Sequence, residues 1–343
     1  MTRFIKKLFL YIIVVIPLPG LILYILISCY PAHFLGDATN YYICKFQYGR
    51  IDSANYKNII IGDSRGNASV APKTLGNDWI NLSIPGTDFF EGFYTLKHYL
   101  PTVTPDTLIM VYGLDHIENG SPFFNEQTIP FQFITPKELH SLELVERRFG
   151  YAYHDKSVVG ATRLFTYQIG RRLRYDHFPL SYRATFIDGL TSLLHPDPSA
   201  EKRFGEIETQ LREDRGHLHF GTADSSNMLS IADTARSFSP RPINLVYLDS
   251  IMAIVKKYNI QTYMIIPPMN QASWLKYKNS TFSRSVDEFL NRLTEKYPQM
   301  HLITEPRYLD NTFFGDMLHL NARGTILYST ELRRHLSAKG KGN

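Results

Sequence analysis

The chain of 343 residues is 44% hydrophobic and 20% charged, which excludes intrinsic disorder because so much apolar surface can be buried to offset chain entropy. With only two cysteines, Cys29 and Cys44, and one long apolar run, it is neither a disulfide scaffold nor a polytopic membrane protein. The formal net charge of +5 is too small to indicate nucleic-acid binding, and the length suits one anchored domain of roughly 300 residues or two of roughly 150.

Residues 1–30 are predicted to form a short cytoplasmic tip and a transmembrane anchor. Residues 8–29 carry no charge, and a helix of that length measures about 33 Å, which matches the hydrocarbon core of a bilayer. Basic residues precede the run and no Lys or Arg follows before Lys45, so the positive-inside rule carries the rest of the chain across the cytoplasmic membrane. We expect the anchor to remain uncleaved. The alternatives are a cleaved secretory signal and a lipoprotein box at 26–29, which would place lipid on Cys29.

The remainder divides into a predicted linker at 31–56 and a folded domain at 57–343. Buried strands are predicted where short β-branched or apolar runs end at Gly or Pro, at 58–61, 79–82, 107–112, 261–266 and 301–304. Helices are predicted where apolar residues recur at helical spacing, at 89–99, 248–255, 282–293 and 321–336. This alternation predicts an α/β domain with a parallel sheet covered on both faces.

A basic aromatic insertion at about 117–241 interrupts the alternation. It is rich in aromatic residues and arginine and shows no clear strand pattern. Within it, residues 146–185 contain eight Lys or Arg against three acids, a net charge of +5. Two interpretations stay open: a solvated helical insertion, or a docking face for anionic lipid headgroups, polymer or a membrane partner.

A serine and a histidine are predicted at the edge of the sheet where the strands end. Ser64 follows the strand at 58–61, and sites in open α/β sheets form at the carboxyl ends of strands. Asp316 and His319 precede the last helix, and their i, i+3 spacing in a turn lets the carboxylate meet the imidazole. Such a carboxylate fixes the histidine tautomer, so that the ring can accept a serine proton. Taken separately, each residue has an ordinary structural explanation, as a helix cap, a turn former or a surface side chain.

Together these segments resemble the SGNH (GDS-type) hydrolase superfamily. Gly62-Asp63-Ser64 is similar to its first block, with Ser64 in the nucleophile position. Residues 81–86 resemble the second block, whose glycine, here Gly86, lends an N–H to the oxyanion hole beside that of the serine. Residues 316–324 closely match the last block, which implies that Asp316 is the acid and His319 the base. The resemblance also implies a flavodoxin-like five-stranded parallel sheet.

The third block departs from the family pattern Gly-x-Asn-Asp, in which the Asn side chain donates to the oxyanion. This chain has Gly113-Leu114-Asp115-His116, so a carboxylate occupies the donor position of the oxyanion hole. An ionised Asp115 there would raise the barrier, since such donors are worth several kcal/mol. Three explanations are open: Asp115 is turned away, it is protonated, or another donor such as Arg65 or a backbone N–H replaces it.

The resemblance is strongest to single-span extracytoplasmic proteins that work beside membrane-bound O-acyltransferases. These include the D-alanyl transfer protein of teichoic acid synthesis and the alginate and peptidoglycan O-acetylation proteins. This implies that Ser64 accepts an acyl group delivered across the membrane and passes it to a hydroxyl of a cell-envelope polysaccharide. Two alternatives stay open: an esterase that deacylates such a glycan, and a non-catalytic, membrane-tethered scaffold that binds polymer or partner.

Two further residues are assigned to substrate binding. Arg65 is adjacent to the serine, and Asn270 follows the strand at 261–266, beside Met269. For Met269 and Asn270, packing at the edge of the core is an equal alternative.

The remaining histidines carry weaker hypotheses. Asp115 and His116 form an alternative acid–base pair, which is less favoured than structural packing. His217 and His219 have the spacing of two metal ligands on a strand, but no third ligand is evident. No phosphate-binding glycine loop is present, so we expect neither a cofactor nor a metal.

Overall fold

The computed structural model describes residues 2–11, 17–30, 33, 39–51, 54–125, 127–129, 131–149, 157–176, 186–196, 198–230 and 233–339. At its centre lies a five-stranded sheet in which every neighbouring pair of strands is parallel. Its strands are, in spatial order, β2 (Trp79–Asn81), β1 (Asn58–Gly62), β3 (Thr107–Val111), β4 (Gln261–Ile265) and β6 (Met300–Ile303). This is the strand order of flavodoxin-like sheets, so the predicted α/β class with a five-stranded parallel sheet is confirmed.

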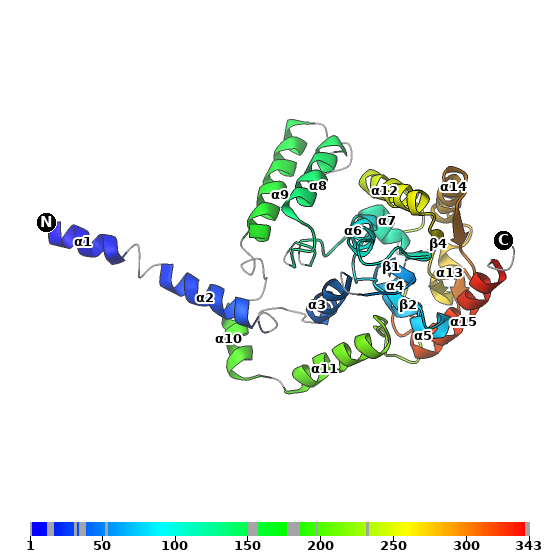
Figure 1. The fold of residues 1–343 in the computed structure, drawn as a ribbon, viewed down its shortest axis with the longest axis horizontal. Helices are drawn as coiled ribbons and strands as arrows, with labels where there is room; N and C mark the ends of the chain where they lie inside the picture. Colours follow the sequence, from blue (N-terminus) through cyan, green and yellow to red (C-terminus); the bar gives the residue numbers. More distant parts are fainter. Residues whose placement is uncertain are drawn as a thin grey trace.

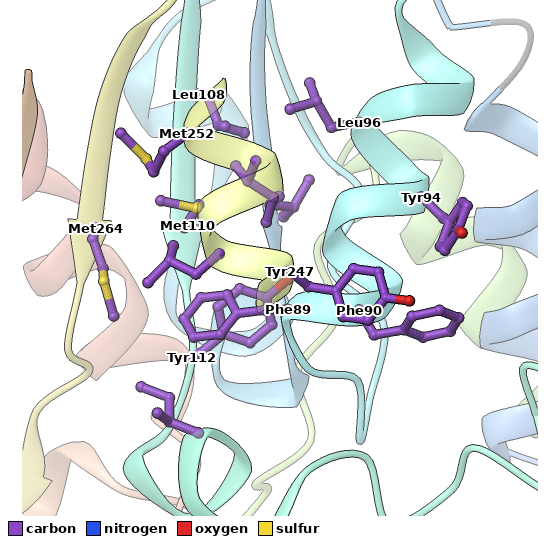
Figure 2. Close-up of a cluster of buried hydrophobic side chains, with 14 of the residues drawn as sticks. Phe89, Phe90, Tyr94, Leu96, Leu108, Met110, Tyr112, Tyr247, Met252 and Met264 are labelled. Carbon is purple, nitrogen blue, oxygen red and sulfur yellow. The ribbon is translucent and has the colours of Figure 1, made fainter. Parts of the chain in front are cut away.

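The strands are apolar throughout because both faces of the sheet are covered. Ile59 and Ile61 of β1 belong to one hydrophobic cluster and Ile60 to another, as the two-residue repeat of a strand requires. Figure 2 shows the first cluster, in which aromatic and methionine side chains gather between the sheet and two helices. Three long helices that bury several apolar side chains in this cluster are α6 (Phe89–Tyr99), α12 (Pro242–Tyr258) and α14 (Thr281–Lys296).

The second face is covered by short helices and by the C-terminal helix (Figure 1). These are α4 (Ser64–Ser69), α5 (Pro72–Leu75) and α15 (Ala322–Lys339). The chain passes from β1 to β2 on one side and then crosses to β3 on the other side of β1. Where the connections diverge in this way, they leave a crevice outside the carboxyl ends of the strands. Ser64, two residues after the end of β1, and Gly113, two residues after the end of β3, lie at this edge of the sheet.

The N-terminal part of the described chain contains α1 (Thr2–Leu10) and α2 (Pro17–Cys29), which extend away from the sheet (Figure 1). The predicted span at 8–29 includes residues 12–16, which lie outside the described residues. In the part of the chain that the structure describes, no helix combines the length and the apolar character needed to cross a membrane.

Helix α3 (Thr39–Ile51) lies within the segment predicted as a linker. Its Ile43 and Ile51 are buried. Its Gln47 is also buried and donates from Nε2 to the carbonyls of Asn81, at 3.1 Å, and Gly216, at 3.0 Å. The predicted linker at 31–56 is therefore wrong for 39–51. The reason is that this helix docks partly through a hydrogen-bonding glutamine, which a search for apolar spacing does not detect.

The described residues of the insertion include four long helices, whereas residues 214–230 and 233–241 form neither helix nor strand. The helices are α8 (Pro136–Phe149), α9 (Val158–Asp176), α10 (Phe186–Leu194) and α11 (Pro198–Glu213). Helices α8 and α9 form a pair that projects from the domain (Figure 1). Helix α11 packs against α3, where Leu211 and Leu218 share a small hydrophobic cluster with Ile43.

Short elements complete the site-bearing edge of the domain. A two-stranded sheet pairs β5 (Met269–Asn270) with β7 (Tyr308–Leu309). The remaining elements are α7 (Leu114–Asn119), α13 (Gln271–Tyr277) and the 3-10 helix η3 (Asn311–Phe313).

Candidate active site

Ser64 is placed by the buried carboxylate of Asp63, which precedes it. Asp63 caps α4 by accepting from the Arg65 backbone N–H at 2.8 Å through Oδ1. Its Oδ2 accepts from the Gly113 N–H, also at 2.8 Å. One carboxylate therefore joins the end of β1 to the loop after β3, and it fixes the turn that carries Ser64.

The structure brings Ser64, His319 and Asp316 together in a continuous hydrogen-bonded chain. His319 Nε2 lies 2.8 Å from Ser64 Oγ, and His319 Nδ1 lies 2.7 Å from Asp316 Oδ2. Asp316 Oδ1 accepts from the backbone N–H groups of Leu318 and His319, each at 2.7 Å. Burial alone would raise the pKa of Asp316, but the hydrogen bonds and charge of His319 and these N–H groups hold it below its usual value.

The protonation pattern of this chain follows from the ionised carboxylate. Asp316 is an acceptor only, so Nδ1 of His319 carries the proton and donates it to Asp316. In the neutral ring Nε2 is then free to accept the hydroxyl proton of Ser64. This is the arrangement in which a histidine acts as a general base toward a serine.

Two backbone N–H groups next to the serine make no hydrogen bond within the described part of the chain: those of Ser64 and Gly86. The Gly62 carbonyl accepts from the Ile84 N–H at 2.9 Å and from Thr87 Oγ1 at 2.8 Å, which holds the loop carrying Gly86 beside the serine turn. Gly86 has φ +71°, and a Cβ there would lie 2.1 Å from the Phe123 ring, so the loop requires glycine. Neither N–H group is engaged by another group among the described residues.

Asp115 is paired with Arg65 rather than protonated. Arg65 Nη1 lies 2.5 Å from Asp115 Oδ1 and 3.2 Å from Asp63 Oδ2. Burial acts to raise the pKa of Asp115, but the Arg65 guanidinium outweighs it and holds the pKa at about 2. The guanidinium rests against Gly113, where a Cβ would lie 1.1 Å from Nη1. The ion pair favours the ionised form of Asp115 over the protonated form, and Arg65 compensates its charge.

A cleft of about 260 Å³ opens beside this ion pair. Arg65 and Asp115 lie at its wall, and farther along it lie Glu118 and Arg236, which are ion-paired with each other. The rest of the lining is mostly apolar and includes Leu114, Ile266, Pro267, Met269, Met317 and Leu318. The last two residues lie between Asp316 and His319, so the cleft adjoins the histidine loop.

Asn270 does not line this cleft. It is fully buried and caps α13, accepting from the Ser273 N–H at 2.8 Å and donating to the Met228 carbonyl at 2.8 Å. The predicted substrate-binding role of Asn270 is therefore wrong, because its side chain is used in these structural hydrogen bonds. Its neighbour Met269 does line the cleft.

Comparisons with known proteins were made against family models, curated proteins and solved structures. No family model matches the chain, and no curated protein matches it. One solved structure, of a Streptococcus pneumonia protein named provisionally as a platelet activating factor, is 11% identical. It covers 86% of this chain and 91% of its own, with a TM-score of 0.38. No functional conclusion follows from so distant a likeness.

The histidines with weaker hypotheses, His116, His217 and His219, lie outside the hydrogen-bonded chain of Ser64, His319 and Asp316. His217 is buried, and its Nε2 lies 3.0 Å from the Ala68 carbonyl oxygen; burial and the nearby His219 lower its pKa to about 4. Among the described residues, no group of three His, Cys, Asp or Glu side chains could hold a metal. His116 Nε2 is 3.8 Å from both Asp63 Oδ2 and Asp115 Oδ2, too far for a hydrogen bond.

The sequence did not indicate Phe220, which stacks on the imidazole of His319. The ring centroids are 5.1 Å apart and the planes differ by 29°. Next to it, the backbone of Gly221 closely contacts that of Gly315, and the Ala223 N–H donates to the Gly315 carbonyl at 3.3 Å. The end of the insertion thus supports the histidine loop. In the sequence, Gly221 and Gly315 are the signal that could have indicated this close contact between the two backbones.

Proposed function

We propose that the protein is a serine-dependent acyltransferase of the SGNH type, with Ser64 as nucleophile. The observation that carries the proposal is the chain from Asp316 through His319 to Ser64, with contacts of 2.7 and 2.8 Å. The unpartnered N–H groups of Ser64 and Gly86 support it as donors to an oxyanion.

In the first half-reaction, Ser64 Oγ attacks the acyl carbonyl while His319 Nε2 takes the hydroxyl proton. The N–H groups of Ser64 and Gly86 donate to the oxyanion of the tetrahedral intermediate. His319 then gives its proton to the leaving oxygen, and the acyl group remains on Ser64. Asp316 stays ionised throughout and stabilises the imidazolium.

In the second half-reaction, a hydroxyl of the acceptor loses its proton to His319 and attacks the acyl-serine. Collapse of the intermediate releases the new ester and returns the proton to Ser64 Oγ. The acceptor is a cell-envelope polysaccharide on the outer side of the membrane, and a membrane-bound O-acyltransferase is the partner that supplies the acyl group. The sequence blocks and the uncharged run at 8–29 support this assignment.

The catalytic part is tested by exposing the purified chain to an activated acetyl ester and weighing the intact protein. We expect an acetyl adduct on the wild type, none on Ser64→Ala or His319→Ala, and a reduced amount on Asp316→Asn. Ser230→Ala is the matched control, because it removes a serine hydroxyl from the cleft lined by Arg65 and Asp115 without touching Ser64, and it should leave the adduct unchanged. An adduct at wild-type level on Ser64→Ala would overturn the assignment.

The transfer part is tested by adding an oligosaccharide acceptor to the acylated protein. We expect the acyl group to appear on the sugar faster than as free acid. Release to water alone, at a rate that the sugar does not change, would replace the transferase by an esterase of the same mechanism.

A further inference from the structure

Helix α9 exposes an apolar face that no described residue covers. Val158, Val159, Phe165 and Ile169 have exposed fractions between 44% and 83%. Val158, Phe165 and Ile169 are separated by seven and four residues and so form one stripe along the helix. The opposite stripe, with Leu164, packs inward against the rest of the domain. A contiguous exposed apolar stripe on a folded domain indicates an interaction surface.

In α8 and α9, the acidic side chains named below are buried, whereas several basic side chains are exposed. Helix α8 contains Glu138, Glu143 and Glu146, and all three are buried. Glu146 is bound by Arg171 at 2.8 Å and Glu143 by Arg172 at 3.0 Å, both from α9. Glu138 is bound by Lys97 and His98 of the domain. The three acids of α8 are thus buried and paired with basic side chains.

Among the side chains that the structure describes in this helix pair, the exposed charges are basic. Arg147 and Arg148 lie at the end of α8, and Arg163 lies on the second turn of α9. Exposed apolar residues lie one helical turn away: Leu144 from Arg147 and Arg148 on α8, and Val159 from Arg163 on α9. The outer surface therefore combines arginines with apolar side chains, the combination found in helices that lie in the interface of anionic membranes.

The position of α9 in the molecule agrees with a surface that meets a membrane. In Figure 1 its long axis runs across the direction of α1 and α2. His33, which follows α2, lies with its Nδ1 3.0 Å from Ser192 Oγ of α10, the helix that follows α9 in the chain. The insertion and the apolar N-terminal helices are thus connected, and α2 itself exposes Leu18, Leu21 and Ile25.

We propose that α9 lies in the headgroup layer of an anionic phospholipid bilayer. Phe165 and Ile169 enter the boundary of the acyl chains, and Arg147, Arg148 and Arg163 bind the anionic headgroups. This surface is independent of the serine chemistry. It orients the domain on the membrane, whereas the N-terminal run alone would leave the domain free to rotate.

The test uses the full chain in vesicles and a readout local to α9, so that lipid binding expected of the apolar N-terminal helices does not produce the signal. An environment-sensitive NBD probe is attached to Phe165→Cys in a Cys29→Ser background; the other cysteine, Cys44, is buried. Vesicles of phosphatidylcholine are compared with vesicles that also contain phosphatidylglycerol. The matched control is Ile326→Cys on α15, whose residue is 62% exposed in the wild type.

We expect the probe at position 165 to shift to the blue and to be quenched by spin-labelled lipid in the anionic vesicles, while the probe at 326 does not. Replacing Arg147, Arg148 or Arg163 by Gln should lower the ratio of docked to undocked α9 about fivefold each. Equal responses at 165 and 326 would overturn the proposal, as would equal responses in both vesicles. A shift at 165 that requires an added membrane protein would replace the lipid surface by a protein partner.

Discussion

The carboxylate in the third block gives a prediction whose size can be worked out. Asp115→Asn removes the ion pair with Arg65 but keeps the shape of the side chain and an oxygen that can accept from Nη1. In the folded protein the pKa of Asp115 is lowered from 3.8 to about 2, which for a fully buried group corresponds to about 2.5 kcal/mol. Because the side chain is 50% exposed, screening reduces the expected loss in free energy of unfolding to about 1 kcal/mol at neutral pH.

The pH dependence of this loss has a definite sign. A carboxyl whose pKa is lowered by folding stabilises the fold above its unfolded-state pKa, and the effect disappears as the pH falls through the folded-state pKa. The difference between wild type and Asp115→Asn should therefore be constant above about pH 5 and shrink from about pH 4 to pH 2. Urea unfolding followed by circular dichroism across this range measures it.

The same variant tests the role of the carboxylate in the reaction. Removing a negative charge from the wall of the cleft next to the serine should keep or increase hydrolysis of a small acetyl ester. A loss of about tenfold or more, which is about 1.4 kcal/mol of transition-state stabilisation, would show that the carboxylate itself is needed.

For the stability experiment, a difference in free energy of unfolding between wild type and Asp115→Asn that persists unchanged at pH 2 would refute the ion-pair account.

Three further predictions follow from contacts around the site. Phe220→Ala should lower kcat about tenfold or more with little change in KM, because the His319 ring loses its stacking partner and its alignment; a selective rise in KM would contradict this. Gly113→Ala should destabilise the fold by about 1–3 kcal/mol, since its Cβ would overlap Arg65. Gly170→Ala, in open space on α9, should instead stabilise the fold by about 0.5–1 kcal/mol. Equal effects of the two variants on urea unfolding would refute the steric argument. Protease added to intact spheroplasts should degrade the domain if it lies outside the cytoplasm, and a protected domain would contradict the predicted topology.

Much of the sheet was predictable because buried parallel strands are uninterrupted apolar runs. Residues 59–61 and 108–111 contain no polar side chain, so the ends of these strands differ from the prediction by at most one residue. The contact between Ser64 and His319 was also predicted, because the carboxyl ends of β1 and β6 lie at the same edge of a parallel sheet.

The missed features depend on polar groups or on contacts between distant segments. Asn270 looks like any polar residue after a strand, and only the structure shows that its amide caps a helix. Phe220 stacks on a ring 99 positions away along the chain, a pairing that local patterns do not encode. The compensation of Asp115 by Arg65 likewise joins the first and third blocks, which are 50 positions apart.

The buried carboxylate of Asp63 affects how a genetic screen of this protein should be interpreted. It touches no reacting atom, yet it positions the serine turn, the Gly113 loop and the Arg65 guanidinium at once. A screen scored on acyl transfer alone would group substitutions of Asp63 with those of His319. Measuring protein abundance in the same cells separates them, because loss of the buried carboxylate lowers the amount of folded protein and loss of the base does not.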